Sequence, residues 1–223
     1  MYGFLAALVG ALTSLQSRFN GQLSKDIHNG IAAALISFGT GYIVLIAITI
    51  FSLKDRQGLI ALYSAIKHKR LKKWEIVGGM VGGFFVAVQA TTVPIIGVAI
   101  FTICTIGGQT ASSLLVDKWG ISPRGKQHIT APRVFAAVMT LIAVTVAVFP
   151  DLGKSTFKFA PVFFALLVGA IVSFQQALNG RVNEHAKRPI ATAWLNFLMG
   201  SFVLSIALAV DLLRGGTIGA LPS

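Results

Sequence analysis

Long apolar stretches alternate along the chain with short polar or basic segments. Several of these stretches reach the 18 or more residues that are typical of membrane-spanning helices. The apolar pattern places the expected spans at about residues 2–23, 31–53, 74–92, 95–116, 134–149, 159–180 and 190–213. Pro94, between the third and fourth spans, is expected to break or kink the chain. The pattern predicts an all-α fold, a polytopic membrane helix bundle of about seven transmembrane helices.

The first span has a second copy later in the chain. Residues 4–45 align with residues 163–204 without a gap, at an offset of 159 positions. Matching stretches of this kind are the sequence signature of transporters that are built from internal repeats. Five expected spans, an odd number, separate the two copies, so the copies should cross the membrane in opposite directions.

We therefore expect inverted five-helix repeats, of which the second is incomplete. The first repeat covers residues 1–153, and residues 154–223 form the first two helices of the second repeat. Three further helices would complete that repeat. We expect the chain to be a truncated part of a ten-helix protein, with a partner that supplies the missing helices as the alternative.

Small residues and one charged segment add detail to this bundle. Gly39 and Gly41 are expected to form packing notches in the second span. The four glycines within residues 78–83 make two overlapping small-xxx-small pairs, which let a neighbouring backbone approach closely. Residues 57–66 lie in a basic connection and are expected to form a short amphipathic helix at the membrane interface.

Composition supports a membrane location. The chain is 55% hydrophobic, has a mean hydropathy of +0.78, and is only 12% charged, about half of what soluble domains carry. Its net charge of +12 would suggest nucleic acid in a soluble protein. Fourteen of the 19 Lys and Arg residues, however, lie in the segments 54–73, 118–133 and 181–188. All three segments fall on one side of a seven-span bundle.

The positive-inside rule makes that side cytoplasmic and places the N-terminus in the cytoplasm. We therefore expect a multi-pass protein of the inner (plasma) membrane, in contact with the lipid bilayer and not with nucleic acid.

Neutral polar residues carry the candidate chemistry. Gln16 and Asn20 in the first span return as Gln175 and Asn179 in the second copy, and the fourth span has a polar stripe with helical spacing. The candidate substrate-binding residues are Gln16, Asn20, Thr105, Gln109, Ser112, Gln175 and Asn179. Alternatively, the same side chains form hydrogen bonds between helices. If they face a common cavity, Asn20→Leu should abolish transport and leave the bundle nearly as stable.

Other chemistries lack the residues that they need. All seven acidic residues lie in loops or at span ends. A proton-coupled cation pump would usually need an acidic residue at mid-membrane. The four histidines are widely spaced, and Cys104 is the single cysteine, so no disulfide within the chain is possible. No catalytic or nucleotide-binding motif is present. We expect no enzymatic activity, no metal and no cofactor.

The motifs Gln16-x3-Asn20-Gly21, Gly108-Gln109 and Ser113-Leu114-Leu115-Val116-Asp117, followed by Gly120, resemble the drug/metabolite transporter superfamily. The likeness is closest to its YdcZ-type, EamA-like branch in the fused two-repeat form. It implies five-helix units paired in opposite orientation and transport of small metabolites. Gln16 stands where small multidrug resistance relatives carry a membrane-embedded acid, which argues against proton-coupled export of organic cations.

Two functional hypotheses follow. The first is a secondary transporter of small neutral or zwitterionic metabolites that works by alternating access, with the small-molecule substrate as its partner and a homodimer or partner subunit as a further option. The second is a non-transporting membrane scaffold or assembly subunit. A water-filled, amide-lined cavity between the first, fourth and sixth spans would favour the transporter, and a fully packed bundle would favour the scaffold.

Overall fold

The computed structural model describes residues 2–151 and 159–220, and every regular element in them is a helix. The expected repeat boundary at residues 153 and 154 lies outside the described residues. The elements are α1 (Tyr2–Asp26), α2 (Gly30–Phe51), α3 (Leu53–Lys67), α4 (Lys73–Trp119), α5 (Ala131–Val148), the short 3-10 helix η1 (Phe149–Asp151), α6 (Phe159–Ala186) and α7 (Pro189–Leu213).

The protein is a polytopic membrane helix bundle. Among the described residues, α2, α4, α5, α6 and α7 are long and apolar enough to cross a membrane. α1 has 25 residues but does not belong to this apolar set. α4 has 47 residues and accounts for two of the expected spans, because its backbone turns sharply at Gly97. The break was expected at Pro94, but it lies three residues later, where glycine tolerates the positive φ of 78°.

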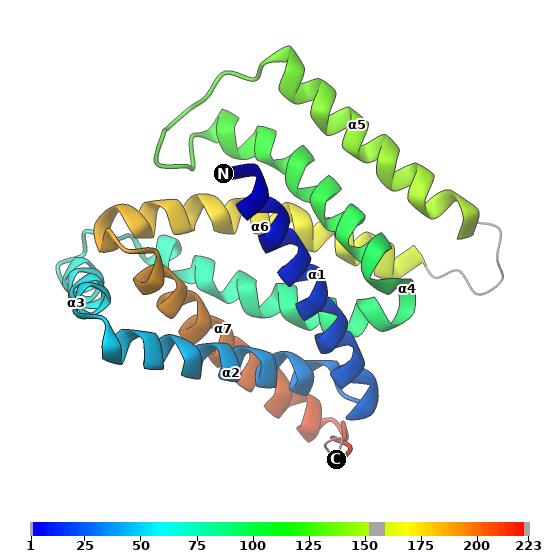
Figure 1. The fold of residues 1–223 in the computed structure, drawn as a ribbon, viewed down its shortest axis with the longest axis horizontal. Coiled ribbons are helices and arrows are strands. Elements are labelled where there is room, and N and C mark those ends of the chain that lie inside the picture. The colour runs from blue at the N-terminus through cyan, green and yellow to red at the C-terminus, as the bar shows by residue number, and fades with distance from the viewer. Residues whose placement is uncertain (1, 152–158, 221–223) are drawn as a thin grey trace.

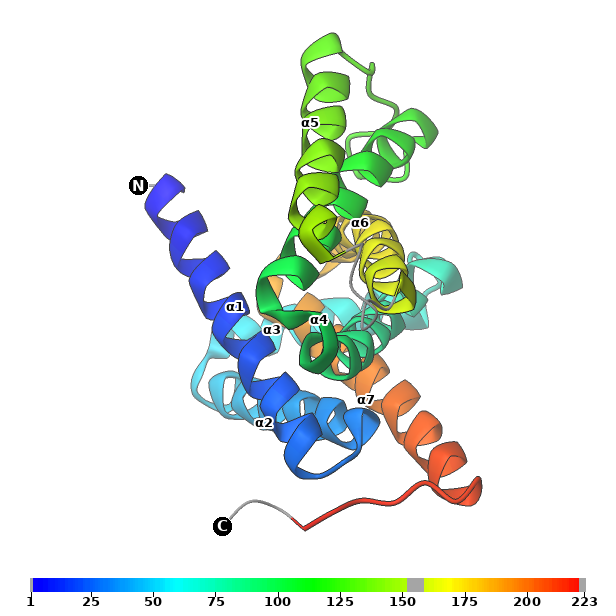
Figure 2. The ribbon, with the colours of Figure 1, turned by 90° about the vertical axis from the view of Figure 1, so that its right-hand side faces the viewer.

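The two ends of the bundle differ in the connections that they carry. Figure 1 shows α3, the start of α4 and the α6–α7 turn together at one end, which we call the basic end. The α1–α2 turn and the break in α4 lie at the opposite end. Figure 2 shows α1 and α5 as separate arms that project from the bundle in different directions. The helix expected over residues 57–66 is present as part of α3.

The two sequence copies meet in a reciprocal contact between α2 and α7. The ring of Phe38 fills the space above Gly200, and the ring of Phe197 fills the space above Gly41. The 159-residue offset relates Phe38 to Phe197 and Gly41 to Gly200. The two rings pack on each other with their centroids 4.9 Å apart. α2 runs toward the basic end and α7 runs away from it (Figure 1), which is the arrangement that inverted repeats require.

Glycines allow the other close helix crossings. Gly83 packs on the backbone of Gly200, and Gly79 packs on the backbone of α7 near Asn196. The close approach of a neighbouring backbone expected at these glycines is therefore present, and the neighbour is α7. The notch expected at Gly39 is wrong, because a side chain added there would meet open space. Of the two glycines expected to form notches, therefore, only Gly41 receives a neighbouring side chain.

The outward faces of the bundle are apolar. Phe19 on α1, Ile43 on α2 and Phe135 on α5 each leave about two thirds of their surface exposed. Soluble monomers rarely expose contiguous apolar surface of this kind, whereas lipid covers it without cost. The exposed faces are therefore consistent with a bundle that is surrounded by lipid.

Candidate functional site

A cavity of about 710 Å³ lies between α1 and α2. We call it the amide cavity, because Gln16, Asn20 and Gln22 of α1 line it. Leu and Ile side chains make up much of the remaining wall, together with Ser37 and Thr40 of α2. Pockets of about 300–1,000 Å³ with a few polar groups in an apolar wall are typical of small-molecule sites. This cavity is large enough for a small metabolite.

The contact between the two repeats forms part of the cavity wall. Gly41 and Phe197, which pack on each other, both line the amide cavity. A shift of α7 against α2 would move Phe197 and change the shape of the cavity. The cavity therefore borders the contact between the two sequence copies.

Asn20 is held by a second amide and does not point freely into the cavity. Its Nδ2 donates a hydrogen bond to Oε1 of Gln89 on α4 at 2.9 Å. Gln89 Nε2 in turn donates to Ser17 Oγ at 2.7 Å, and Ser17 donates to the Thr13 carbonyl at 2.8 Å. Asn20 and Gln89 are only 4% and 1% exposed. The hydrogen bonds among Ser17, Asn20 and Gln89 therefore join α1 to α4 just before the break in α4.

Gln16 has a different environment from Asn20, although the two lie one turn apart. Gln16 is exposed and lines the amide cavity, and its side chain forms no hydrogen bond with any described residue. The polar side chains of this part of α1 are therefore divided between two environments. Ser17 and Asn20 pack against α4, and Gln16 remains available to a ligand.

The polar stripe of the fourth span packs against α6. Ser112 Oγ lies 2.7 Å from both Ser173 Oγ and the Gly108 carbonyl oxygen. The carbonyl of Ala170 is a further acceptor, 3.1 Å from Ser112 Oγ and 2.9 Å from Ser173 Oγ. Thr105 is buried, and its hydroxyl has no hydrogen-bond partner in the described part of the chain. Gly108 faces the α6 backbone so closely that an added side chain would overlap it. Ser112 lines a separate cavity of about 420 Å³ against α5 and α6.

The second carboxamide pair is not a copy of the first in its environment. Gln175 is buried and its Nε2 lies against Gly82, close to the ring of Phe38. Asn179 and Gln109 are half-buried, and neither side chain forms a hydrogen bond with a described residue. In the first copy the asparagine is buried and the glutamine is exposed, whereas in the second copy the glutamine is buried and the asparagine is half-buried.

The seven candidate residues thus do not line one common cavity. Gln16 and Asn20 border the amide cavity, Ser112 borders another, and the wall of the amide cavity includes none of Thr105, Gln109, Gln175 or Asn179. The expectation of a shared central cavity is therefore not met.

Three polar residues of these clusters are absent from the sequence-based set of candidates. They are Ser17, Gln89 and Ser173. Gln89 is the informative omission, because a single glutamine near the end of an apolar span needs a buried partner. An unpaired amide in an apolar medium costs roughly 2–7 kcal/mol, so the presence of Asn20 and Gln89 in apolar helices could have indicated the pair.

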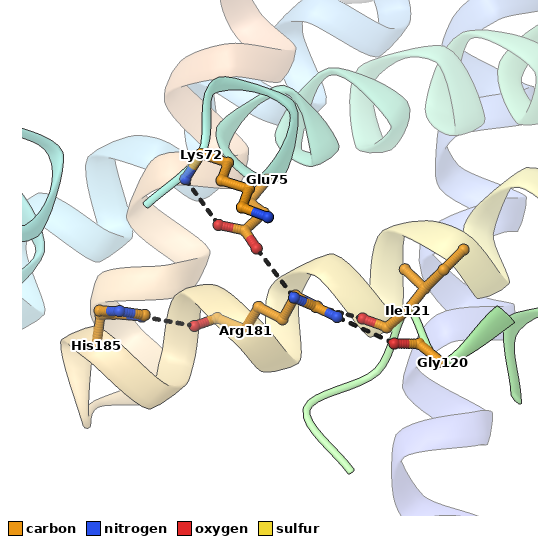
Figure 3. Close-up of polar contacts among 6 residues, drawn as sticks. All are labelled: Lys72, Glu75, Gly120, Ile121, Arg181 and His185. Atoms are coloured by element: carbon orange, nitrogen blue, oxygen red, sulfur yellow. Dashed lines mark hydrogen bonds and ion pairs between the residues drawn. The ribbon is translucent and has the colours of Figure 1, made fainter. Parts of the chain in front are cut away.

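Ion pairs close the basic end of the bundle. Figure 3 shows Arg181 of α6 between Glu75, at 3.3 Å from its guanidinium, and the carbonyl oxygens of Gly120 and Ile121 after α4. Glu75 also accepts a hydrogen bond from the Lys72 backbone at 2.8 Å, so it fixes the start of α4. Arg181 therefore ties both ends of α4 to α6.

Two further ion pairs lie at helix ends outside the apolar core. Arg133 pairs with Asp117, and Arg188 Nε lies 3.1 Å from Asp55 Oδ1. A hydrogen bond with Ser52 and, after it, the Arg188 guanidinium hold the pKa of the Asp55 carboxyl below its ordinary value, against the opposing effect of burial. Asp55 is therefore charged at neutral pH and pairs α3 with the α6–α7 turn.

Comparison with known proteins agrees with this architecture. No curated protein and no solved structure matches the chain. One family model, described as "Putative inner membrane exporter, YdcZ", matches residues 1–146 and 160–220, which is nearly the whole chain. The resemblance expected from the motifs in the first, fourth and sixth spans is thereby confirmed. The chain therefore belongs to the DMT_YdcZ family of membrane transporters.

Proposed function

We propose that the protein is a secondary transporter of small neutral or zwitterionic metabolites that works by alternating access. The observation that carries this proposal is that Gly41 and Phe197, which join the two repeats, also line the amide cavity. Inverted repeats can pack in two related ways, and exchange between these packings exposes a site to each side of the membrane in turn. Family membership supports transport in general, and the cavity supports the class of substrate.

The polar groups of the amide cavity favour a substrate without net charge. Gln16 offers a free carboxamide, which can both donate and accept hydrogen bonds. Ser37 and Thr40 add hydroxyl groups on the facing helix. Asp26, the one acidic residue of the cavity wall, accepts a hydrogen bond from Gln22 at 2.8 Å and can also accept one from a substrate ammonium group. A substrate with a net charge would lose its hydration in the apolar part of the cavity without enough opposite charges to compensate.

The ion pairs suggest which end must open. The basic end is closed by Arg181 and its partners, while the amide cavity extends to Asp26 near the opposite end. Transport therefore requires that the contacts of Arg181 are exchanged for others when the repeats repack. With the basic end on the cytoplasmic side, as the positive-inside rule favours, the N-terminus is cytoplasmic and the cavity faces outward.

The proposal is tested with purified protein in proteoliposomes and a panel of labelled neutral, zwitterionic and cationic compounds. We expect saturable flux of at least one neutral or zwitterionic compound, and none of the organic cations. Flux of cations alone would contradict the proposed substrate class. Folded protein without flux of any compound in either direction would favour the scaffold hypothesis.

A further inference from the structure

A further cavity lies at the basic end, and it shares no wall residue with the amide cavity. It has a volume of about 430 Å³ and lies between α3 and the α6–α7 turn. Three of its wall residues are cationic, namely Lys54, Lys187 and Arg188, and Gln57 adds a neutral polar group. We call it the cationic pocket. None of its residues belongs to the proposed transport site.

Arg188 is fixed in place within this pocket. Its side-chain stem lies directly on Gly58 of α3, where an added Cβ would come within 2.6 Å of Arg188 Cγ. Its guanidinium then reaches Asp55, with 3.1 Å between Nε and Oδ1. The lack of a side chain at Gly58 therefore allows the α6–α7 turn to approach α3 closely. This contact and the Arg188–Asp55 ion pair fix one wall of the pocket.

The other two cations are not neutralised. Lys54 and Lys187 are exposed, and neither forms an ion pair with an acidic side chain among the described residues. Asp55 is engaged by Arg188, so the pocket keeps an excess of two positive charges. Arg188 is the N-cap of α7 and makes no side-chain cap, so the positive end of that helix dipole adds to the same field.

An apolar stripe borders the pocket on α3. Leu53 and Ile60 are 72% and 68% exposed. Leu53, Gln57 and Ile60 are spaced four and three residues apart, so they lie on one face of α3. This face is next to the one that carries Lys54 and Ala61. Phe51, at the end of α2, is also strongly exposed. A ligand in the pocket therefore has an anion-binding region and an apolar region side by side.

We propose that the cationic pocket binds the phosphate headgroup of an anionic phospholipid, whose acyl chains lie against Leu53 and Ile60. Basic pockets between transmembrane helices are a recurring way to bind such headgroups. The exposed apolar stripe favours a lipid over a free phosphate ester, since a soluble anion would leave the stripe in water. The bound lipid would bridge α3 and the start of α7.

Native mass spectrometry of the protein in neutral detergent, titrated with phosphatidylglycerol, tests this site. The double variant Lys54→Gln/Lys187→Gln should weaken binding by about thirtyfold, as expected for two interfacial cations. The matched control, Lys67→Gln/Lys69→Gln, removes the same charge from exposed positions at the same end but outside the pocket. It should change binding by less than about threefold.

Each other outcome overturns the proposal. Equal losses in both double variants would mean a diffuse basic surface without a defined pocket. Equal binding of phosphatidylcholine would mean that charge is not recognised. Displacement of the lipid by soluble glycerol phosphate at similar concentration would make the ligand a free phosphate ester. Because all four substitutions are at exposed side chains, loss of the fold does not confuse these outcomes.

Discussion

Asn20 on α1 and Gln89 on α4 are joined by a hydrogen bond of 2.9 Å between two almost fully buried amides. Gln16, one turn before Asn20, lies in the amide cavity without such a partner. Two carboxamides of the same motif therefore have different roles. Asn20 holds two helices together, and Gln16 is the residue that we expect to contact substrate.

The first prediction concerns the buried pair. Asn20→Leu should lower the free energy of unfolding by about 1–3 kcal/mol, because it leaves Gln89 Oε1 without its donor. This differs from the expectation for a cavity-facing amide, whose loss would leave stability unchanged. Unfolding of the protein in detergent, followed by circular dichroism, measures the effect.

A double-mutant cycle shows whether the two amides act together. Gln89→Leu alone should cost a similar amount, and Asn20→Leu with Gln89→Leu should cost less than the sum of the two. Additive losses would mean that the hydrogen bond does not contribute, and the structural role of Asn20 would be wrong.

A second prediction tests the reciprocal contact between the repeats. Gly41→Ala and Gly200→Ala should each destabilise the bundle by about 1–3 kcal/mol, because the added methyl group overlaps the ring of Phe197 or Phe38. Gly39→Ala in the same helix meets open space and is the matched control, which should be neutral or slightly stabilising. Equal effects at Gly39 and Gly41 would contradict the contact.

The repeat itself provides the control for a third prediction. Gly169 on α6 lies against the Thr105 backbone, and its equivalent in the first copy, Gly10 on α1, has no neighbour. Gly169→Ala should cost about 3 kcal/mol, near the upper end of overpacking effects, since a backbone cannot move aside as a side chain can. Gly10→Ala should cost nothing measurable. Comparable thermal stability of the two variants would show that α4 and α6 do not cross this closely.

A fourth prediction concerns topology. Single cysteines at the exposed positions Lys69, Gln127 and Lys187 should be protected from a membrane-impermeant thiol reagent in intact cells. A cysteine at Lys25, near the opposite end, should react. Cys104 is fully buried and gives a low background. Labelling of the Lys25 and Lys69 positions from the same side would contradict the arrangement of the spans.

Much of the fold could be predicted from the sequence because lipid imposes a simple rule on apolar length. The spans follow from runs of apolar residues, and the repeat follows from a gapless self-alignment that pairs Phe38 with Phe197. The position of the break in α4 was wrong by three residues. Proline removes one backbone donor, but the sharp turn needs a residue that accepts positive φ, and Gly97 is the nearest one after Pro94.

The site was harder to predict, since helical spacing gives the face of a residue and not its partner. Thr13, Gln16, Ser17 and Asn20 share one broad face, but the angle of α1 divides that face between α4 and the amide cavity. The partner Gln89 lies 69 residues from Asn20. Helix crossing angles are set by glycine contacts such as Gly108 with α6, and single-sequence patterns do not encode these angles directly.

The most direct test of the account is substrate flux by Gln16→Leu in proteoliposomes, normalised to folded protein and compared with Asn20→Leu. Gln16 has no partner among the described residues, so its replacement should leave the free energy of unfolding unchanged and reduce flux at least tenfold, the effect of losing one good hydrogen bond to substrate. Asn20→Leu should instead lose stability. Unchanged flux in Gln16→Leu would contradict the assignment of the amide cavity as the transport site.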